Sequence, residues 1–158
     1  MVRVTSGTTC RGGRALNERA GMRGARPRSA EGMMTELAKK SDRLIEAYNA
    51  KNFDAMSALM APDIDFAHYN RNFVLQSRDA LIEVLQGFAS TYAPDRRFED
   101  PEMVIEVGDT VIRQAWYVGT AAVDLPGFGA AGEEFRLKFC SFMRFGPDGL
   151  IVEWKDFG

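Results

Sequence analysis

The segment FRLKFCSFMRFGPDGLIVEWKDF, residues 135–157, has the pattern of two β-strands joined by a tight turn. Before the turn, charged side chains at positions 136, 138 and 144 alternate with large apolar ones, which is the period of a strand with one buried face. The turn sequence GPDG at 146–149 consists of residues that favour turn geometry. The segment therefore predicts an antiparallel hairpin with an apolar face directed inward.

Alternation along these two strands also predicts which side chains face the interior. The inward set of the first strand consists of Phe135, Leu137, Phe139, Ser141, Met143 and Phe145. The inward set of the second strand consists of Leu150, Val152, Trp154 and Asp156. Because the second set is apolar until it ends in a carboxylate, we expect an internal pocket with Asp156 near its rim.

Further strands are predicted closer to the N-terminus. Period-two alternation runs over residues 98–107 and 110–121, and Gly108 with the following aspartate favours a hairpin turn between them. Earlier in the chain, Phe66 and His68 alternate with their neighbours in the same way. This alternation predicts another strand, with His68 on its apolar face.

Helical periodicity is found before and between these strands. Thr35 can cap a first amphipathic helix that ends near Asn52, and residues 54–60 predict a short second helix that Pro62 stops. Ser77 can cap a third helix, whose buried stripe consists of Leu81, Ile82, Leu85, Phe88 and Ala89. Helices followed by a long antiparallel meander indicate a cone-shaped α+β fold, with three N-terminal helices packed on a strongly curved, mainly antiparallel sheet.

The composition divides the chain into residues 1–32 and 33–158. Residues 1–32 hold seven Arg and no Lys against two Glu, with few large apolar groups, so we expect a disordered leader. Such a leader is typical of a transit segment, or of translated sequence upstream of a start at Met33 or Met34, which we favour. The remaining 13 basic and 20 acidic side chains give residues 33–158 a charge of −7, which argues against nucleic-acid binding.

Cysteine, histidine and hydropathy patterns restrict the function further. The two cysteines, Cys10 and Cys140, show no pattern of disulfide pairing, so we expect a cytoplasmic protein. His68 is the only histidine in the sequence, so we expect no metal site. No window approaches the roughly 18 apolar residues of a membrane span, so no membrane partner is expected.

Three segments together resemble the nuclear transport factor 2-like superfamily, with SnoaL-like polyketide cyclases, ketosteroid isomerases and limonene epoxide hydrolases as the most similar members. They are RLIEAYNAKNFDAMSALMAPDIDF at 43–66, SRDALIEVL at 77–85 and FMRFGPDGLIVEWKDFG at 142–158. The resemblance covers residues 35–158. It is more specific for the fold than for the reaction, because this fold hosts enzymes and pure binding proteins alike.

The catalytic positions of these relatives are only partly present. The resemblance to the isomerases places His68 at the position of the general base, whereas the oxyanion-donating tyrosine and aspartate map near Leu44 and Ser141. The resemblance to the epoxide hydrolases matches Asp156 to one catalytic aspartate, but the other members of that set map near Ala115 and Tyr117. The cyclase histidine and aspartate are likewise replaced. The chain therefore resembles these enzymes without a complete catalytic set from any of them.

Four residues are candidates for catalysis. His68 is the expected base, although a histidine packed at a pocket wall has the same pattern. Asp156 is expected to be its partner or the acid, or else a structural group that pairs with Arg113. Tyr117 and Ser141 are expected to donate hydrogen bonds to a substrate oxygen, or to satisfy each other.

The expected substrate is an apolar carbonyl, polyketide, steroid-like or terpenoid compound, converted by cofactor-independent acid–base chemistry of the SnoaL-like class. The side chains expected to line its site are Phe66, Trp154, Met143, Phe88 and Phe139. A non-catalytic binding protein for a hydrophobic ligand is the alternative. A homodimeric assembly module is another, in which the outer sheet face associates through Ile151, Phe157, Phe142 and Cys140.

Overall fold

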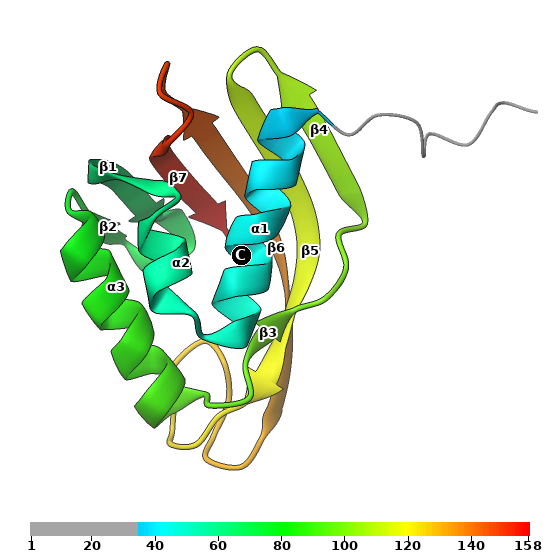
Figure 1. The fold of residues 1–158 in the computed structure, drawn as a ribbon. Coiled ribbons are helices and arrows are strands. Elements are labelled where there is room, and N and C mark those ends of the chain that lie inside the picture. Colours follow the sequence, from blue (N-terminus) through cyan, green and yellow to red (C-terminus); the bar gives the residue numbers. More distant parts are fainter. Residues whose placement is uncertain (1–34) are drawn as a thin grey trace, which may run out of the picture. The chain divides into compact units, whose positions relative to one another are not determined.

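The computed structural model describes residues 35–158, in which three α-helices pack on one seven-stranded sheet (Figure 1). The strands are β1 (Met60–His68), β2 (Phe73–Leu75), β3 (Arg97–Phe98), β4 (Met103–Val107), β5 (Thr110–Thr120), β6 (Glu134–Phe145) and β7 (Ile151–Phe157). Their order is β2-β1-β7-β6-β5-β3, and β4 also pairs with β5. Within the described residues β1 and β7 run parallel and the other pairs are antiparallel. The predicted α+β class is confirmed, whereas the prediction for residues 1–32 lies outside the described residues.

Helix α1 (Glu36–Ala50) begins where the sequence predicts. The Thr35 side chain accepts a hydrogen bond from the Ala38 backbone N–H at 3.2 Å, which satisfies one of the free donors of the first turn. Leu44 and Tyr48 lie one turn apart on the buried face of the helix. This face packs against β3, β4 and β5.

Helix α2 (Phe53–Ser57) is shorter than predicted, and Pro62 does not end it. Strand β1 already begins at Met60, so Pro62 lies inside a strand. The pairing of β1 with β7 shifts register between Met60 and Asp65. Proline is tolerated there because its missing N–H removes no regular hydrogen bond at an irregularity. The prediction that Pro62 stops the helix is therefore wrong.

Helix α3 (Arg78–Gly87) has the predicted cap, since Ser77 Oγ accepts from the Ala80 backbone N–H at 3.3 Å. A five-residue π-helical segment continues it through Tyr92. Of the predicted stripe, Leu81 and Ala89 are buried and the others are half-buried. Leu85 and Phe88 remain half-buried because they line a cavity.

The predicted strand over residues 98–107 is divided into β3 and β4. Pro101 lies between them, where the chain leaves regular pairing with β5, because proline cannot donate to a strand ladder. The predicted turn between β4 and β5 is present, and Gly108 adopts a φ of +63° there. Such a backbone conformation favours glycine.

The parity predicted for β6 is confirmed, because its inward set is buried or half-buried. In β7 the prediction fails for Ile151. The β6–β7 pairing shifts register between Arg144 and Phe145, so Ile151 turns into the core and is fully buried. Ile151 is therefore not part of the outer apolar face.

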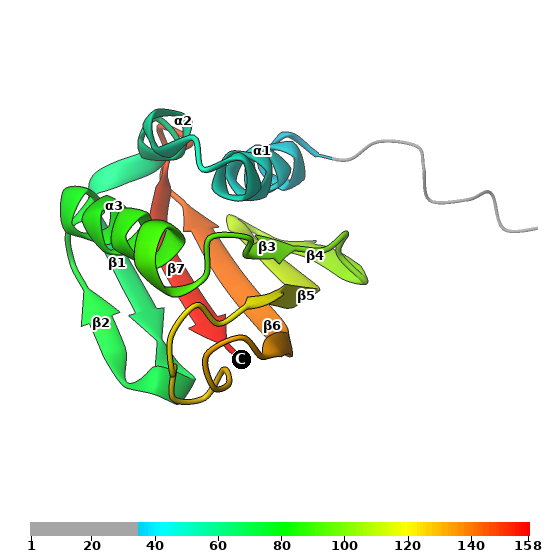
Figure 2. The same ribbon diagram turned by 90° about the horizontal axis from the view of Figure 1, so that it is seen from below.

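Figure 2 shows the helices gathered on one side of the curved sheet. The loop that joins β5 to β6 lies at one end of this arrangement, near the C-terminal end of α3 (Figure 2). Its Phe128 packs on Phe88, Tyr117 and Phe135, with ring centroids 5.0 to 6.3 Å apart. No helix among residues 35–158 has the length and apolar character needed to cross a membrane.

Candidate functional site

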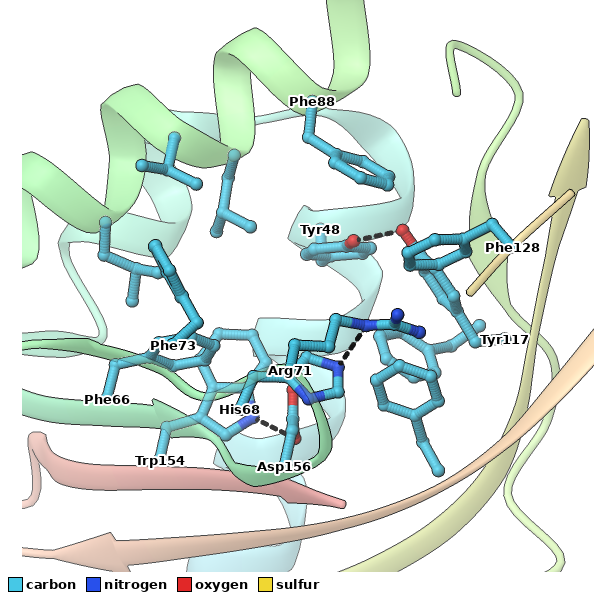
Figure 3. Close-up of a pocket in the computed structure, with 15 residues that line it drawn as sticks. Tyr48, Phe66, His68, Arg71, Phe73, Phe88, Tyr117, Phe128, Trp154 and Asp156 are labelled. Atoms are coloured by element: carbon cyan, nitrogen blue, oxygen red, sulfur yellow. Dashed lines mark hydrogen bonds between the residues drawn. The ribbon is translucent and has the colours of Figure 1, made fainter. Parts of the chain in front are cut away.

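A cavity of about 280 Å³ lies between the helices and the inner face of the sheet (Figure 3). Most of its lining is aliphatic or aromatic, which is typical of small-molecule sites. Its lining side chains that carry polar groups, apart from the Trp154 indole, are those of Tyr48, His68, Arg71, Tyr117 and Asp156. Each of them comes from a different element or loop, so the site exists only in the folded chain.

Four of the five predicted lining residues border this cavity: Phe66, Phe88, Phe139 and Trp154. Met143 does not. It is fully buried in the core and lies opposite Trp154 in the β6–β7 register. Alternation predicts which face of the sheet a residue occupies, but not its position along the strand relative to the cavity. The prediction that Met143 lines the pocket therefore does not hold for this cavity.

Asp156 is buried, with 4% of its surface exposed, and does not lie at the predicted rim. Its Oδ1 atom accepts two hydrogen bonds, from Ser141 Oγ at 2.5 Å and from Trp154 Nε1 at 2.8 Å. Its Oδ2 atom has no hydrogen bond to residues 35–158. Burial raises the pKa of Asp156 to about 6, against the opposing effect of the two hydrogen bonds.

His68 occupies the position opposite Asp156 in the parallel β1–β7 pair. Its Nε2 atom accepts a hydrogen bond from Arg71 Nε at 3.2 Å. Because an arginine nitrogen only donates, Nε2 must be unprotonated and the imidazole proton is assigned to Nδ1. Burial, with the charge of Arg71, lowers the pKa of His68 to about 4. His68 is therefore neutral at pH 7, and its buried Nδ1–H has no hydrogen-bond partner among residues 35–158.

Tyr48 and Tyr117 form a hydrogen-bonded pair, with their hydroxyl oxygens 2.8 Å apart (Figure 3). Burial raises the pKa of Tyr48 to about 12 and that of Tyr117 well above its usual value, so both are protonated at neutral pH. One hydroxyl donates to the other, which leaves one O–H free to donate elsewhere. Sequence reasoning missed Tyr48, although it follows Leu44 by one turn on the same helix face.

Arg96 stacks on the ring of Tyr48, one member of this pair. Its guanidinium carbon is 4.2 Å from the centroid of the Tyr48 ring, and 1% of the residue surface is exposed. The positive charge of Arg96 acts to lower the pKa of both tyrosines, opposing the dominant effect of burial. A buried cation at this place stabilises negative charge that develops on or beside the two hydroxyl groups.

Ser141 and Arg113 have structural partners. The Ser141 hydroxyl is directed at Asp156 and does not border the main cavity. Arg113 pairs with Asp42 and donates to Ser41 Oγ at 3.0 Å, so the expected alternative of an Arg113–Asp156 pair is not observed. Within residues 35–158, no group of three or more His, Cys, Asp or Glu side chains is arranged to hold a metal ion.

Comparison with known proteins identifies a family. The model of the SnoaL-like domain matches residues 42–154. No curated protein matches the chain.

Several solved structures share the fold. A proposed polyketide cyclase from Xanthomonas campestris pv. campestris is 22% identical, with a TM-score of 0.67 over 77% of this chain and 89% of its own. IdmH, a proposed polyketide cyclase from Streptomyces antibioticus, is 21% identical, with a TM-score of 0.64 over 77% of this chain and 91% of its own. A ketosteroid isomerase-like protein from Catenulispora acidiphila, solved with trimethylamine, is 15% identical, with a TM-score of 0.63 over 80% and 87%. At these identities the likeness establishes the fold alone.

Proposed function

Because the chain belongs to the SnoaL-like domain family, we propose that it is a small-molecule enzyme that works by cofactor-independent general acid–base chemistry. The substrate is an apolar carbonyl compound of polyketide, steroid-like or terpenoid character. The observation that carries this proposal is Asp156, a buried carboxyl group in an apolar cavity whose pKa of about 6 suits proton transfer near neutral pH.

Asp156 acts as the base through its Oδ2 atom. Ser141 and Trp154 hold Oδ1 and fix the plane of the carboxyl group, so the oxygen without a hydrogen bond is the one available to the substrate. Oδ2 takes a proton from the carbon beside the substrate carbonyl, and the electron pair of the C–H bond moves onto the carbonyl oxygen. Return of the proton to another carbon of the conjugated enolate completes an isomerisation. In a cyclisation, the enolate carbon instead attacks a second carbonyl, and the proton held by Asp156 passes to the alkoxide that forms.

The free hydroxyl of the Tyr48–Tyr117 pair donates to the carbonyl oxygen as its negative charge develops. The high pKa values of both tyrosines keep them protonated, and the nearby Arg96 charge favours an anion at this position. Asp156 lines the same cavity as both tyrosines, and its charge acts to raise the pKa of each of them. Ser141, expected as a donor to substrate, supports Asp156 in this proposal instead.

His68 was the expected base, and the geometry favours a different role for it. Its Nε2 lone pair accepts from Arg71, and its pKa of about 4 makes it a weaker base than Asp156. We therefore assign proton abstraction to Asp156. The Nδ1–H of His68 becomes a second hydrogen-bond donor beside the carboxyl group.

Proton abstraction can be tested on 2-tetralone, an uncharged bicyclic ketone with acidic C–H bonds beside its carbonyl. Exchange of these protons in D2O, followed by NMR, should be accelerated by the protein. The Asp156→Asn variant should lose about 10²–10⁴-fold of that acceleration, since general-base catalysis contributes this much. Asp65→Asn is the matched control, because Asp65 lies on the adjacent strand and pairs with Lys155 at 2.5 Å outside the cavity.

An Asp156→Asn variant that is folded and exchanges protons as fast as the unaltered protein would contradict the proposal. Binding of 2-tetralone without Asp156-dependent exchange would instead support the second candidate function, a non-catalytic carrier of a hydrophobic ligand. The apolar lining of the cavity favours that candidate, because such a lining binds a ligand whether or not it is turned over.

We also propose that two copies associate through the outer sheet face. Phe157 is 42% exposed there and its ring packs against Tyr69 and Phe142, with centroids 4.9 and 5.6 Å apart. Arg144, paired with Glu153, borders this aromatic group. An exposed aromatic cluster with a charged rim is the composition of many protein interfaces.

A further inference from the structure

Arg71 differs from the other polar groups of the cavity because it carries a full positive charge. It ends η1, the short 3₁₀ helix Tyr69–Arg71 that follows β1, and its side chain borders the cavity. The other cavity-lining cation candidate, His68, is neutral at pH 7. Arg71 is therefore the cationic lining group that an anion inside the cavity can contact directly.

The guanidinium of Arg71 is held in place from two sides. Its carbon lies 3.8 Å from the centroid of the Phe128 ring, and its Nε donates to His68 Nε2 at 3.2 Å. Stacking fixes the plane of the group, and the hydrogen bond fixes its rotation within that plane. The two terminal nitrogens are thereby presented in one orientation before any ligand binds, which reduces the entropy lost on binding.

No carboxylate among residues 35–158 lies within ion-pair distance of this fixed cation. Seven ion pairs join side chains among residues 35–158, and Arg71 is in none of them. Burial disfavours its charge and lowers the pKa of Arg71 below its usual value. Asp156 also lines the cavity, but its hydrogen bonds go to Ser141 and Trp154. A partly desolvated arginine with free terminal nitrogens fits the planar, bidentate shape of a carboxylate.

We propose that Arg71 makes this cavity a site for apolar acids, in which the ligand's carboxylate pairs with the guanidinium and its hydrocarbon body fills the aromatic interior. This inference rests on the proposed function and narrows its substrate class. The carboxylate end stays near Arg71, while the opposite part of the ligand extends along Phe66, Phe139 and the tyrosine pair.

The test uses 2-naphthoate and its uncharged isostere 2-naphthamide, which differ in charge but hardly in size. Quenching of tryptophan fluorescence reports binding, because Trp154 borders the cavity. The unaltered protein should bind naphthoate about 10- to 100-fold more tightly than naphthamide, the range expected for hydrogen bonds to a charged group. Arg71→Met should remove this preference, so that the affinities for naphthoate and naphthamide become equal, whereas Arg71→Lys should keep part of it because the charge remains.

The matched control is Arg136→Met. Arg136 also stacks on an aromatic ring, with its guanidinium carbon 3.9 Å from the Trp116 ring centroid, but it lies outside the cavity. This variant should keep the full preference for naphthoate. Equal affinities for the two probes in the unaltered protein, or no binding of either, would overturn the inference. An equal loss of both in Arg71→Met would overturn it too, since that pattern indicates a purely structural role.

The two proposals can fail separately. 2-Tetralone carries no charge, so its exchange reports on Asp156 and not on an Arg71–carboxylate contact. A preference for naphthoate without exchange would refute only the catalytic proposal. Exchange without that preference would refute only the apolar-acid inference.

Discussion

His68 and Asp156 occupy opposite positions of two parallel strands, yet their side chains hydrogen-bond different partners. His68 is bound by Arg71 from the loop side, and Asp156 is bound by Ser141 from the neighbouring strand and by Trp154. The pKa of His68 is lowered to about 4 and that of Asp156 is raised to about 6, so the carboxyl group has the higher pKa of the two. Of these two residues, Asp156 is therefore the one that titrates closer to neutral pH.

The pH dependence of tetralone exchange should identify the base. With Asp156 as the base, the exchange rate rises with pH through a midpoint of about 6 and is constant above it, because only the ionised carboxylate accepts a proton. With His68 as the base, the midpoint would lie near 4. An NMR exchange series from pH 4 to 8 separates these outcomes.

The same carboxyl group should make stability depend on pH. In the unfolded chain an aspartate has a pKa of about 3.9, so between pH 4 and 6 the folded protein holds a proton that the unfolded chain has lost. This contribution of Asp156 to stability falls as pH rises across that window. Relative to the unaltered protein, Asp156→Asn should therefore become more stable with rising pH, by up to about 3 kcal/mol. Urea unfolding at several pH values measures this difference.

His68 should contribute the opposite slope. Its folded pKa of about 4 lies below the unfolded value of about 6.5, so its contribution to stability rises with pH across the same window. Relative to the unaltered protein, His68→Gln should lose stability between pH 4 and 6.5 in the same unfolding series. Parallel profiles for this variant and the unaltered protein would contradict the lowered pKa of His68.

Removing the tyrosine hydroxyls should give non-additive effects. Tyr48→Phe or Tyr117→Phe alone leaves the other buried hydroxyl without its partner, at a cost of about 1–3 kcal/mol, whereas the double variant removes both and should cost less than the sum. The expected effects of these variants on catalysis follow a different pattern from their effects on stability. A single remaining hydroxyl still donates to substrate, so only the double variant should lose about 10²–10³-fold in tetralone exchange. Thermal unfolding and exchange rates on the same three proteins test both statements.

Gly127→Ala should disturb Arg71. Gly127 has a φ of +80°, and a Cβ atom there would lie 2.7 Å from the Arg71 Nη1 atom. We expect a loss of about 1–2 kcal/mol in stability from the backbone conformation alone, together with weaker naphthoate binding from the displaced guanidinium. Gly108→Ala is the control, because Gly108 also has a positive φ but an added Cβ would meet no atom within 4 Å. It should lose stability without losing naphthoate affinity.

Phe157→Asp should abolish the proposed association of two copies. The substitution places a charge in the cluster formed with Tyr69 and Phe142 while leaving the inner face of β7 unchanged. Sedimentation velocity at micromolar concentration should give a dimer for the unaltered protein and a monomer for the variant. A monomeric unaltered protein would contradict the proposal.

Alternation and capping residues carry enough information to predict the layers of this fold. Thr35 and Ser77 cap helices by short-range hydrogen bonds, and the parity of β6 depends only on which neighbours are apolar. The failures occur where long-range pairing decides the outcome. Register shifts place Pro62 inside a strand and turn Ile151 into the core, and neither shift can be deduced from local sequence.

The sequence predicts only part of the candidate site, because contacts between distant segments decide the rest. Parity correctly directed Asp156 and Tyr117 inward, but the partners of each polar group depend on which strands and loops become neighbours. Arg71 follows His68 by three residues, but nothing in the local sequence indicates that Phe128, far along the chain, packs on it. Tyr48 was the residue that helical spacing alone could have identified.

The parallel pairing of β1 with β7 has a consequence for how the protein folds. Strand β7 follows the other six strands in the sequence, but it lies between β1 and β6 in the sheet. The β1–β2 pair therefore joins the rest of the sheet only when β7 pairs with both β1 and β6. His68 and Asp156 are 88 positions apart in the sequence, and contacts at such separation form slowly because a long loop must close first. The site is therefore complete only when β7 has paired with both β1 and β6.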